Sequence, residues 1–315
     1  MHRPGDPKVA HARIVRYGPA DIFGAMTRAT RPCPACGAPP GRLLPDYRAH
    51  HLARCTRCGA AYADRIPTTA ELEAYYGDYW IKEELPALTA KRYDALLDTM
   101  AAYRSIGRLI DVGSGGGGFL ERAALRGWEA HGTEYGSRTV ESLRRRGFHM
   151  QEGPLNADNY PQGSFDVLTS LEVIEHVIDP RLELAAMHRL LRPGGLIYLT
   201  TPNFNALTRH FSKGRWTIVN YPEHLTLFTA SSLDALLRRT GFERISLRTT
   251  GASLSRFKES HHIGDQKANE TAADDERLRN SIEANPLLRG AKAIVNGLLN
   301  ATRLGDTLKA MYRKA

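Results

Sequence analysis

Long hydrophobic runs are missing from this sequence of 315 residues. No stretch approaches the roughly 20 consecutive apolar residues that a helix needs to cross a bilayer, so a membrane-spanning protein is not expected. The N-terminal stretch MHRPGDPKVAHARIVRYG has no apolar core of the kind found in secretion signals. Internal repeats and low-complexity tracts are also missing. These absences predict a cytoplasmic protein.

Acidic residues are too few to balance the basic ones: 34 Asp and Glu stand against 43 Lys and Arg, giving a formal net charge of +9. The excess lies largely at the two ends of the chain. Residues 1–31 hold six basic and two acidic residues, and residues 256–315 hold eleven and eight. A nucleic-acid groove normally forms a basic stripe on the folded body. Solvated tails explain this distribution at least as well, so a nucleic-acid partner is not expected.

Cysteine is scarce, and all four cysteines lie in one short window as CPAC and CTRC, with the spacing C-x2-C-x18-C-x2-C. Cys33, Cys36, Cys55 and Cys58 therefore match the spacing of a zinc site. Each pair is followed by a glycine, which suits a tight knuckle around a metal. Two disulfides or four free thiols are the alternatives, and disulfides are disfavoured in a reducing compartment.

Four thiolates would complete a tetrahedral zinc ion and leave no open position, so the predicted metal is structural. A module of about 30 residues cannot bury a sufficient core of its own. It is therefore expected to unfold when the metal is removed. The zinc module by itself does not indicate a function.

Glycine is concentrated in the segment DVGSGGGGFLERAAL, residues 111–125. A short apolar run precedes it, an amphipathic helical pattern follows, and a second apolar run ends at Glu134. This strand–loop–helix–strand order is typical of a doubly wound α/β sheet, in which ligands bind beyond the carboxyl ends of the strands. The glycines let a nucleoside-bearing cofactor approach the main chain, and Glu134 is placed to accept hydrogen bonds from ribose hydroxyls. Because the segment also satisfies G-x-G-x-x-G, a nicotinamide dinucleotide remains an alternative.

Three further features narrow the choice: Asp111 two residues before the first glycine, a strand in FDVLTSLEVIEHV, and a Pro-Gly-Gly turn before the strand in LLRPGGLIYLTTPN. With these motifs, residues 105–250 resemble the class I S-adenosylmethionine-dependent methyltransferases. The resemblance implies an α/β, Rossmann-like, seven-stranded methyltransferase sheet, preceded here by a small zinc ribbon. It also implies S-adenosylmethionine as the cofactor. The cofactor-binding residues expected from it are Asp111, Gly113, Ser114, Gly115, Gly117, Glu134, Tyr135, Leu155, Asn156 and Glu172.

The expected domain organisation follows from this comparison. Residues 1–31 form a basic tail, 32–65 the zinc-ribbon module, 66–105 a helical linker or cap, and 106–315 the methyltransferase domain. Within the last, residues 254–303 form a helical insertion before the final strand. The segment 285–303 is expected to be an amphipathic helix that covers the substrate site, with contact to a membrane surface as the alternative. The oligomeric state is not indicated.

The stretch LEVIEHV offers acidic and imidazole groups close to the cofactor. Glu172 and His176 are four residues apart, so a helix would place them on one face. Glu175 is expected to lie in solvent at the helix start. His176 is a possible catalytic base, although a structural role is the more common one for an isolated histidine.

A second polar group, YPEHL at residues 221–225, follows the fifth expected strand. Methyl transfer needs a base for the acceptor's proton, and an imidazole suits neutral pH. His224 is the predicted base and Glu223 orients it, while capping or loop anchoring is the alternative role of His224. The zinc module, the class I core and Tyr-x-Glu-His together resemble bacterial methyltransferases of nucleotide-linked deoxysugars, which implies that Tyr221, Glu223 and His224 line a sugar site.

Aromatic residues gather in AYYGDYW, residues 74–80. Tyr76 and Tyr79 are candidates for the substrate pocket with Asn203, although packing between domains is the more common use of such aromatics.

Three functions follow from the sequence. The first is methylation of a saccharide or nucleotide-sugar, on carbon or on oxygen. The second is O-methylation of a quinone precursor, a phenol or another small molecule, because EVIEHVIDP also occurs in enzymes of that kind. The third, of another class, is a zinc-ribbon nucleic-acid-binding protein with a non-catalytic core.

Overall fold

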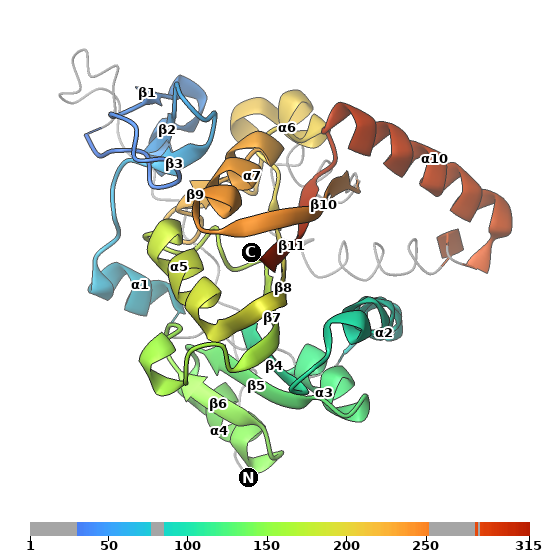
Figure 1. Cartoon of the computed structure of the whole chain (residues 1–315). Coiled ribbons are helices and arrows are strands. Elements are labelled where there is room, and N and C mark those ends of the chain that lie inside the picture. Colours follow the sequence, from blue (N-terminus) through green and yellow to red (C-terminus); the bar gives the residue numbers. More distant parts are fainter. Residues whose placement is uncertain (1–29, 77–84, 252–280, 283) are drawn as a thin grey trace, which may run out of the picture.

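The computed structural model describes residues 30–76, 85–251, 281–282 and 284–315. Two sheets organise this part of the chain, one of seven strands and one of four (Figure 1). The expected α/β methyltransferase sheet is confirmed.

The larger sheet has the strand order β10-β11-β8-β7-β4-β5-β6. All neighbouring pairs are parallel except those that β11 makes with β8 and β10. The chain order reverses between β4 and β7, so a crevice opens at the carboxyl ends of these strands, where ligands bind in open α/β sheets. The strands are β4 (Arg108–Val112), β5 (Glu129–Glu134), β6 (His149–Glu152), β7 (Phe165–Leu171), β8 (Leu191–Pro202), β10 (Phe242–Thr250) and β11 (Thr307–Lys314).

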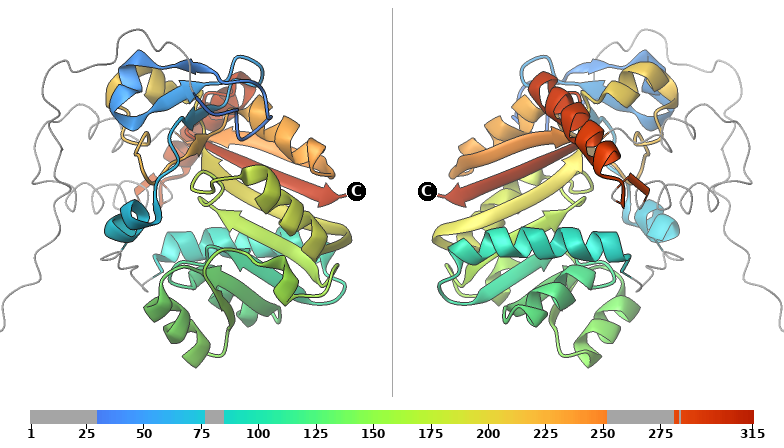
Figure 2. Two further views of the ribbon diagram at one scale, coloured as in Figure 1. Left: turned by 90° about the vertical axis from the view of Figure 1, so that its left-hand side faces the viewer. Right: turned by 90° about the vertical axis from the view of Figure 1, so that its right-hand side faces the viewer.

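Helices cover both faces of this sheet (Figure 2). Successive strand residues point to opposite faces, so Leu109 packs with one group of helices and Ile110 with the other. On one face lie α2 (Ala87–Met100), α3 (Gly118–Leu125) and α4 (Ser137–Arg145), and on the other α5 (Pro180–Leu190) and α7 (Ala230–Arg239). Shorter helices are α1 (Thr69–Tyr76), α6 (Leu207–Ser212), η1 (Pro45–His50), η2 (Ala101–Tyr103), η3 (Ala157–Asn159) and η4 (Lys213–Arg215).

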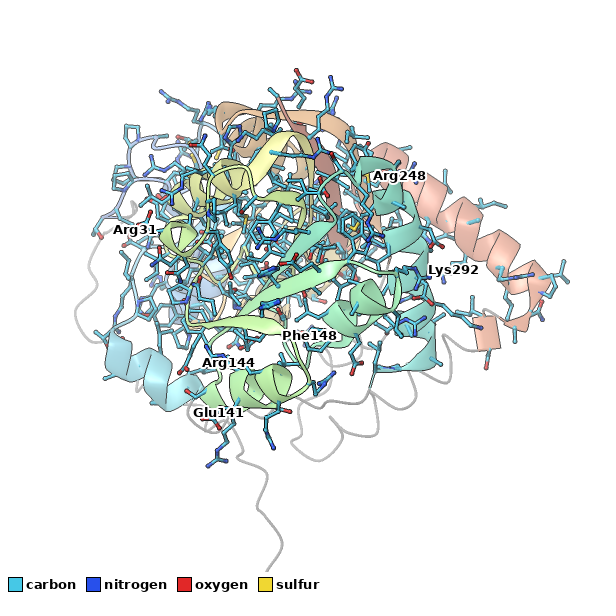
Figure 3. All side chains as sticks on the ribbon, turned by 60° about the horizontal axis from the view of Figure 1, so that its bottom comes forward. Arg31, Glu141, Arg144, Phe148, Arg248 and Lys292 are labelled. Atoms are coloured by element: carbon cyan, nitrogen blue, oxygen red, sulfur yellow. The ribbon has the colours of Figure 1, made fainter. Side chains whose placement is uncertain are left out.

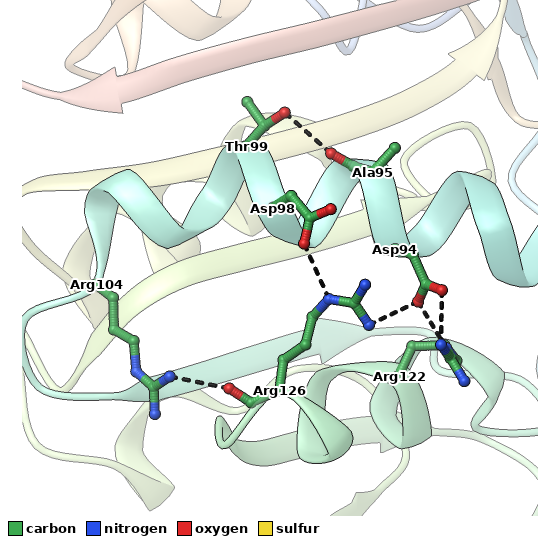
Figure 4. A network of polar contacts seen from close by, with 7 residues as sticks. All are labelled: Asp94, Ala95, Asp98, Thr99, Arg104, Arg122 and Arg126. Atoms are coloured by element: carbon green, nitrogen blue, oxygen red, sulfur yellow. Dashed lines mark hydrogen bonds and ion pairs between the residues drawn. The ribbon is translucent and has the colours of Figure 1, made fainter.

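An ionic network joins α2 to α3 (Figure 4). Asp94 accepts two hydrogen bonds of 2.6 Å from the guanidinium of Arg122 and one of 2.7 Å from Arg126. Arg126 also pairs with Asp98. Bidentate pairs of this kind fix geometry better than single contacts, so the network holds α2 in register above the segment that follows β4.

The cysteine-rich segment is joined to the rest of the chain by a shared sheet. Strands β1 (Arg42–Leu43), β2 (Leu52–Arg54) and β3 (Ala61–Ala63) form an antiparallel sheet, and β3 pairs in turn with β9 (Thr226–Leu227). Tyr62 is fully buried and packs in the same core as Phe228. The segment therefore rests on the residues that follow YPEHL.

The last helix, α10 (Pro286–Thr302), lies in the segment expected to be helical, is capped by Asn285 and is followed by β11. Leu287, Ile294 and Leu298 on α10 are 84%, 68% and 63% exposed, and Leu299 is buried against β10. Among the residues that the structure describes, none of those on α10 lines the cavity above the segment after β4. Cover of the substrate site by this helix stays a prediction. Within the described residues, no helix is long and apolar enough to span a membrane.

Asp166, at the start of β7, carries a fully buried carboxylate. It accepts a 2.5 Å hydrogen bond from Arg192 and further bonds from the backbone N–H groups of Ser105 and Gly107. Burial alone would raise the pKa of Asp166, but these donors hold it below its usual value. The pair thus ties β7 to β8 and to the loop before β4.

We expect Asp166→Asn to lower the free energy of unfolding by about 3 kcal/mol at neutral pH, because it removes one partner of a buried pair. A carboxylate with a lowered folded pKa stabilises the protein above its unfolded pKa of about 3.9, and that contribution is lost as pH falls through the folded pKa. Urea unfolding should therefore show that the difference in the free energy of unfolding between the wild type and Asp166→Asn becomes smaller from pH 7 to pH 3. Asp158→Asn, which breaks an exposed pair with Arg189, should cost less than about 1 kcal/mol. An equal cost for both variants would contradict the assignment.

Candidate active site

The glycine loop, residues 113–118, follows β4 directly. Gly113, Gly115 and Gly117 have φ values of 73°, 51° and 79°, in the left-handed region that L side chains rarely adopt. A Cβ atom on Gly113 would lie 2.5 Å from Val173, and one on Gly117 would lie 2.2 Å from Leu143. These two glycines are thus required by the backbone and by packing within the protein, in addition to any close approach of a cofactor.

A cavity of about 310 Å³ opens beside the glycine loop. Its lining combines the loop with the start of α2 and the end of β7, namely Leu85, Pro86, Thr89, Tyr93, Asp111, Gly113, Ser114, Gly115, Gly116, Gly118, Phe119 and Leu171. Four predicted cofactor residues, Asp111, Gly113, Ser114 and Gly115, are brought together here. Gly117 lies within the same loop.

Glu134, at the end of β5, turns its carboxylate toward the glycine loop. Oε2 accepts a 2.9 Å hydrogen bond from the N–H of Gly115, and Oε1 accepts from those of Tyr135 and Gly136. A carboxylate has about four acceptor positions, so only about one remains. Binding both hydroxyls of a ribose would require one of these N–H bonds to give way.

Asp111 is 2% exposed and lies beneath the loop. Its Oδ1 accepts a 2.6 Å hydrogen bond from Thr169. Burial raises the pKa of Asp111 to about 7, so the carboxyl group is close to its titration point at neutral pH. Ser114 donates to the carbonyl oxygen of Asp111 at 2.8 Å, which closes the turn.

The remaining predicted cofactor residues flank the loop less closely. Leu155 is buried beyond β6, whereas the Tyr135 side chain is 71% exposed. The Asn156 side chain caps η3 by accepting a hydrogen bond from the N–H of Asp158, so this amide oxygen already has a structural partner.

Residues 172–176 form a turn, which corrects the expected helix start. Helix α5 begins only at Pro180, and Glu172 takes a φ of 57°. Glu175 is 1% exposed, so its expected place in solvent is also wrong. The Glu175 side chain accepts a 2.8 Å hydrogen bond from Thr201 on β8. Burial, with Glu172 nearby, raises its pKa well above the usual value.

The segment that carries His224 lies directly against this turn. The N–H groups of Leu225 and Thr226 donate to the carbonyl oxygen of Glu175 at 2.7 and 3.0 Å. The imidazole of His176 donates from Nδ1 to the carbonyl oxygen of Glu223 at 3.0 Å. The rings of His176 and His224 lie 4.7 Å apart. Both histidines predicted as bases therefore share one site.

The carboxylate of Glu223 is held by two groups that the sequence analysis did not single out. Tyr75 donates its hydroxyl to Oε2 at 2.7 Å, and Asn220 donates its amide to the same oxygen at 2.8 Å. Tyr76 ends α1, but its side chain lies outside the described residues, as does all of Tyr79. The neighbouring Tyr75 is the aromatic that reaches this site.

Tyr221 lies where the cysteine-rich segment meets the site. Its N–H donates to Nδ1 of His50 at 3.3 Å, and its ring contacts that of His51 edge-on. The hydroxyl of Tyr221 is buried and has no hydrogen-bond partner among the residues that the structure describes. Because buried polar groups are normally paired, this hydroxyl is available to a bound molecule.

Asn203, predicted to line the substrate pocket, has a structural place instead. It is fully buried at the end of β8. Its amide donates to the carbonyl oxygens of Arg303 and Gly305, and its oxygen accepts from the N–H of Asn205. Every polar group of the side chain is thus used to hold the loop before β11.

The four cysteine sulfurs form a compact cluster. Cys33 and Cys58 are 3.7 Å apart between sulfurs, and Cys36 and Cys55 are 3.6 Å apart. A disulfide would require about 2.05 Å, so the two-disulfide alternative does not fit. Sulfurs about 2.3 Å from a tetrahedral zinc lie about 3.8 Å from one another, and the observed distances fit that geometry.

The electrostatics of Cys55 also suit a metal ligand. Burial alone raises the pKa of its thiol, but the backbone N–H groups of Cys58 and Arg57 and hydrogen bonds with the thiols of Cys36 and Cys58 lower it to about 7. In the same cluster the pKa values of Cys36 and Cys58 are raised, by burial and by the neighbouring thiols. Zinc binds the thiolate form, so a thiol that loses its proton near neutral pH is well suited to the ion.

A second cavity, of about 370 Å³, lies at the opposite edge of the sheet. It is lined by His131, Arg144, Phe148, His149, Met150 and Tyr160, and Figure 3 labels Arg144 and Phe148 at this edge. His131 and His149 lie near the starts of β5 and β6. Because ligands of such sheets bind at the carboxyl ends, the glycine-loop cavity is the better active site.

We expect Gly113→Ala to cost more stability than Gly153→Ala, although both glycines have a positive φ. A Cβ at Gly153 meets nothing within 4 Å, so that variant bears only the backbone strain of about 1–2 kcal/mol. Gly113→Ala adds the contact with Val173, about 1–3 kcal/mol more. Urea unfolding of both variants measures the difference, and equal losses would show that Val173 yields freely.

Comparison with known proteins identifies the family to which the chain belongs. The family described as "Methyltransferase domain" matches residues 82–247, more than half of the chain. The ubiquinone biosynthesis O-methyltransferase of Pseudomonas aeruginosa strain LESB58 is 35% identical over 105 residues, 31% of this chain and 45% of that protein. A protein of Mycolicibacterium smegmatis named "Probable S-adenosylmethionine-dependent methyltransferase" is 33% identical over 156 residues, 49% and 58% of the two chains.

The chain spans less than two thirds of the length of each of these two relatives, from Pseudomonas aeruginosa and Mycolicibacterium smegmatis. A crystal structure of a SAM-dependent methyltransferase from Archaeoglobus fulgidus matches 71% of this chain and 94% of its own, with a TM-score of 0.47 and 17% identity. The family match, the sheet order and the glycine loop at the end of β4 agree. The chain belongs to the S-adenosylmethionine-dependent methyltransferases of class I.

Proposed function

We propose that this methyltransferase acts on a saccharide or nucleotide-linked sugar, at oxygen or carbon. The observation that carries the proposal is a set of polar groups on the segment that packs against the turn at residues 172–176, whose Val173 borders Gly113. These groups are the Tyr75–Asn220–Glu223 cluster, His224 and the unpartnered hydroxyl of Tyr221. A polyhydroxylated acceptor needs several convergent donors and acceptors of this kind. The cofactor, S-adenosylmethionine, supplies a methyl group on a cationic sulfur.

The residues of this chain divide the remaining work. The backbone of Gly113, Ser114 and Gly115, whose N–H groups donate to Thr133 and Glu134, borders the cofactor, and Glu134 binds its ribose. Leu155 and Asn156 border the base, and Glu172 lies at the end nearest the acceptor. Tyr221 and Glu223 orient the acceptor's hydroxyl groups.

His224 is the proposed base. Its Nδ1 lies 2.5 Å from the carbonyl oxygen of Ile218. A carbonyl only accepts hydrogen bonds, so Nδ1 carries the proton and Nε2 carries a free lone pair when the ring is neutral. Nε2 can therefore take a proton from the acceptor. His176 is less suited to that step, because burial and the nearby His224 lower its pKa to about 4.

Each role has a distinct variant. We expect Glu134→Ala to weaken binding of S-adenosylmethionine at least tenfold in calorimetry, because the ribose loses a charged acceptor. His224→Ala should keep that affinity and lose at least a hundredfold in turnover, in the range that general-base catalysis contributes.

Turnover is measured with labelled cofactor and a panel of nucleotide-sugars, and mass spectrometry locates the transferred methyl group. Unchanged turnover in His224→Ala would dismiss it as the base. If only phenolic acceptors are methylated, the saccharide proposal fails and the second candidate stands.

That second candidate is O-methylation of a quinone precursor or another phenol. The relative from Pseudomonas aeruginosa, whose name states that activity, favours it. A nucleic-acid-binding role has less support, because the cysteine-rich segment uses β3 and His50 to hold β9 and Tyr221.

We also propose that Cys33, Cys36, Cys55 and Cys58 hold a structural zinc ion that keeps residues 32–65 folded against β9. Elemental analysis of the purified protein should find one zinc per chain. Cys55→Ser should lose the ion and much of the catalytic turnover, because the segment that supports Tyr221 comes loose. Full retention of activity by a zinc-free protein would contradict this role.

A further inference from the structure

Three side chains of the active site meet at one point. Glu175, His176 and His224 each present one ligand atom, and these atoms lie within 4.8 Å of one another. Oε1 of Glu175 is 3.9 Å from Nε2 of His176. Two ligands on opposite sides of an ion with bonds of about 2.1 Å are about 4.2 Å apart. The three groups are therefore close to the spacing that one ion requires.

Backbone carbonyls orient both imidazoles. Nδ1 of His176 lies 3.0 Å from the carbonyl oxygen of Glu223, and Nδ1 of His224 lies 2.5 Å from that of Ile218. Each Nδ1 is therefore a donor, and the lone pair of each neutral ring is on Nε2. Histidines that bind metals are held in this way, with the second ring nitrogen donating to a carbonyl or carboxylate.

The third group, Glu175, lacks a compensating cation. Its carboxyl group is buried, and one oxygen accepts from Thr201. Among the residues that the structure describes, no lysine or arginine forms an ion pair with Glu175. The carboxyl groups of Glu172 and Glu223 are its acidic neighbours. Ionising this buried carboxyl group without a positive partner is costly, and a bound cation would offset that cost.

We propose that Glu175, His176 and His224 bind a divalent cation of the first transition row. Two imidazole nitrogens and one carboxylate oxygen are ligands that suit Mn²⁺, Fe²⁺, Co²⁺ or Zn²⁺ and leave positions open for other ligands. The turn that carries Glu175 also carries Val173, which borders Gly113 in the glycine loop. The cation would therefore lie beside the place where the acceptor meets the cofactor.

This inference rests on the proposed function for the position of the acceptor and refines the role of His224. With the cation bound, Nε2 of His224 is a ligand, and the positive charge lowers the pKa of the acceptor hydroxyl. The hydroxyl proton then passes to solvent water. In the cation-free protein the same lone pair is the base.

A second cluster of similar composition does not carry the same proposal. Glu129, His131 and His149 also present ligand atoms within 4.8 Å of one another. However, the guanidinium of Arg108 lies 3.1 Å from both Glu129 and His131. The two imidazoles stack at an interplanar angle of 20°, and Nε2 of His131 already pairs with Glu129 at 2.7 Å. This cluster provides a matched control.

The test is a titration of the full-length protein with Mn²⁺, followed by the electron paramagnetic resonance signal of the free ion. Mn²⁺ prefers oxygen and nitrogen ligands and does not compete for a thiolate zinc site. We expect wild-type protein to bind about one Mn²⁺ per chain. Glu175→Gln and His224→Gln should each weaken this binding at least tenfold, because each removes a ligand. His149→Ala should bind Mn²⁺ as the wild type does.

The outcomes separate this inference from the proposed function. If wild-type protein does not bind Mn²⁺ at millimolar concentration, or if both ligand variants bind it normally, the cation site is overturned. Calorimetry with S-adenosylmethionine checks that each variant is folded. If Glu175→Gln, which changes a buried residue, does not fold, the test rests on His224→Gln alone. Full methylation of a nucleotide-sugar by protein that binds no Mn²⁺ would refute only the cation. Normal Mn²⁺ binding without methylation of any saccharide would refute only the acceptor.

Discussion

Two hydrogen bonds hold the active site together: the N–H groups of Leu225 and Thr226 both donate to the carbonyl oxygen of Glu175. They join the turn after β7 to a segment about 50 residues later in the chain. Together with the hydrogen bond from Nδ1 of His176 to the carbonyl oxygen of Glu223, they fix the position of His224 relative to His176. The residues that act on the acceptor therefore depend on a backbone contact, which no single side chain provides.

The cysteine-rich segment extends the same contact outward. Thr226 also belongs to β9, which pairs with β3, and β3 follows the CTRC pair directly. A metal that fixes the four cysteines would therefore also support the strand next to His224. On the opposite side of the cavity, the pair between Asp94 and Arg122 holds α2 above the glycine loop. Structural elements far from the reacting groups thus shape the pocket from two directions.

Local patterns predicted much of this fold, because their signals lie within a few residues of one another. The strand–loop–helix–strand unit at 109–134 and the helix within the segment 285–303 are of this kind. The burial of Glu175 could not be predicted, since it depends on Thr201 and on the segment after Asn220. The same holds for Asn203, whose partners lie 100 residues away.

The sequence analysis named several residues that the structure brings together, but not how they are arranged. The sequence analysis named both histidines and Glu223, but their proximity and the contact with Tyr75 arise from tertiary packing.

The most direct test of the account is a crystal structure of the protein with S-adenosylhomocysteine. We expect the ligand along residues 113–117, with its ribose at Glu134 and its sulfur toward His224. Binding in the cavity near His131, or with the sulfur turned away from His224, would contradict the account.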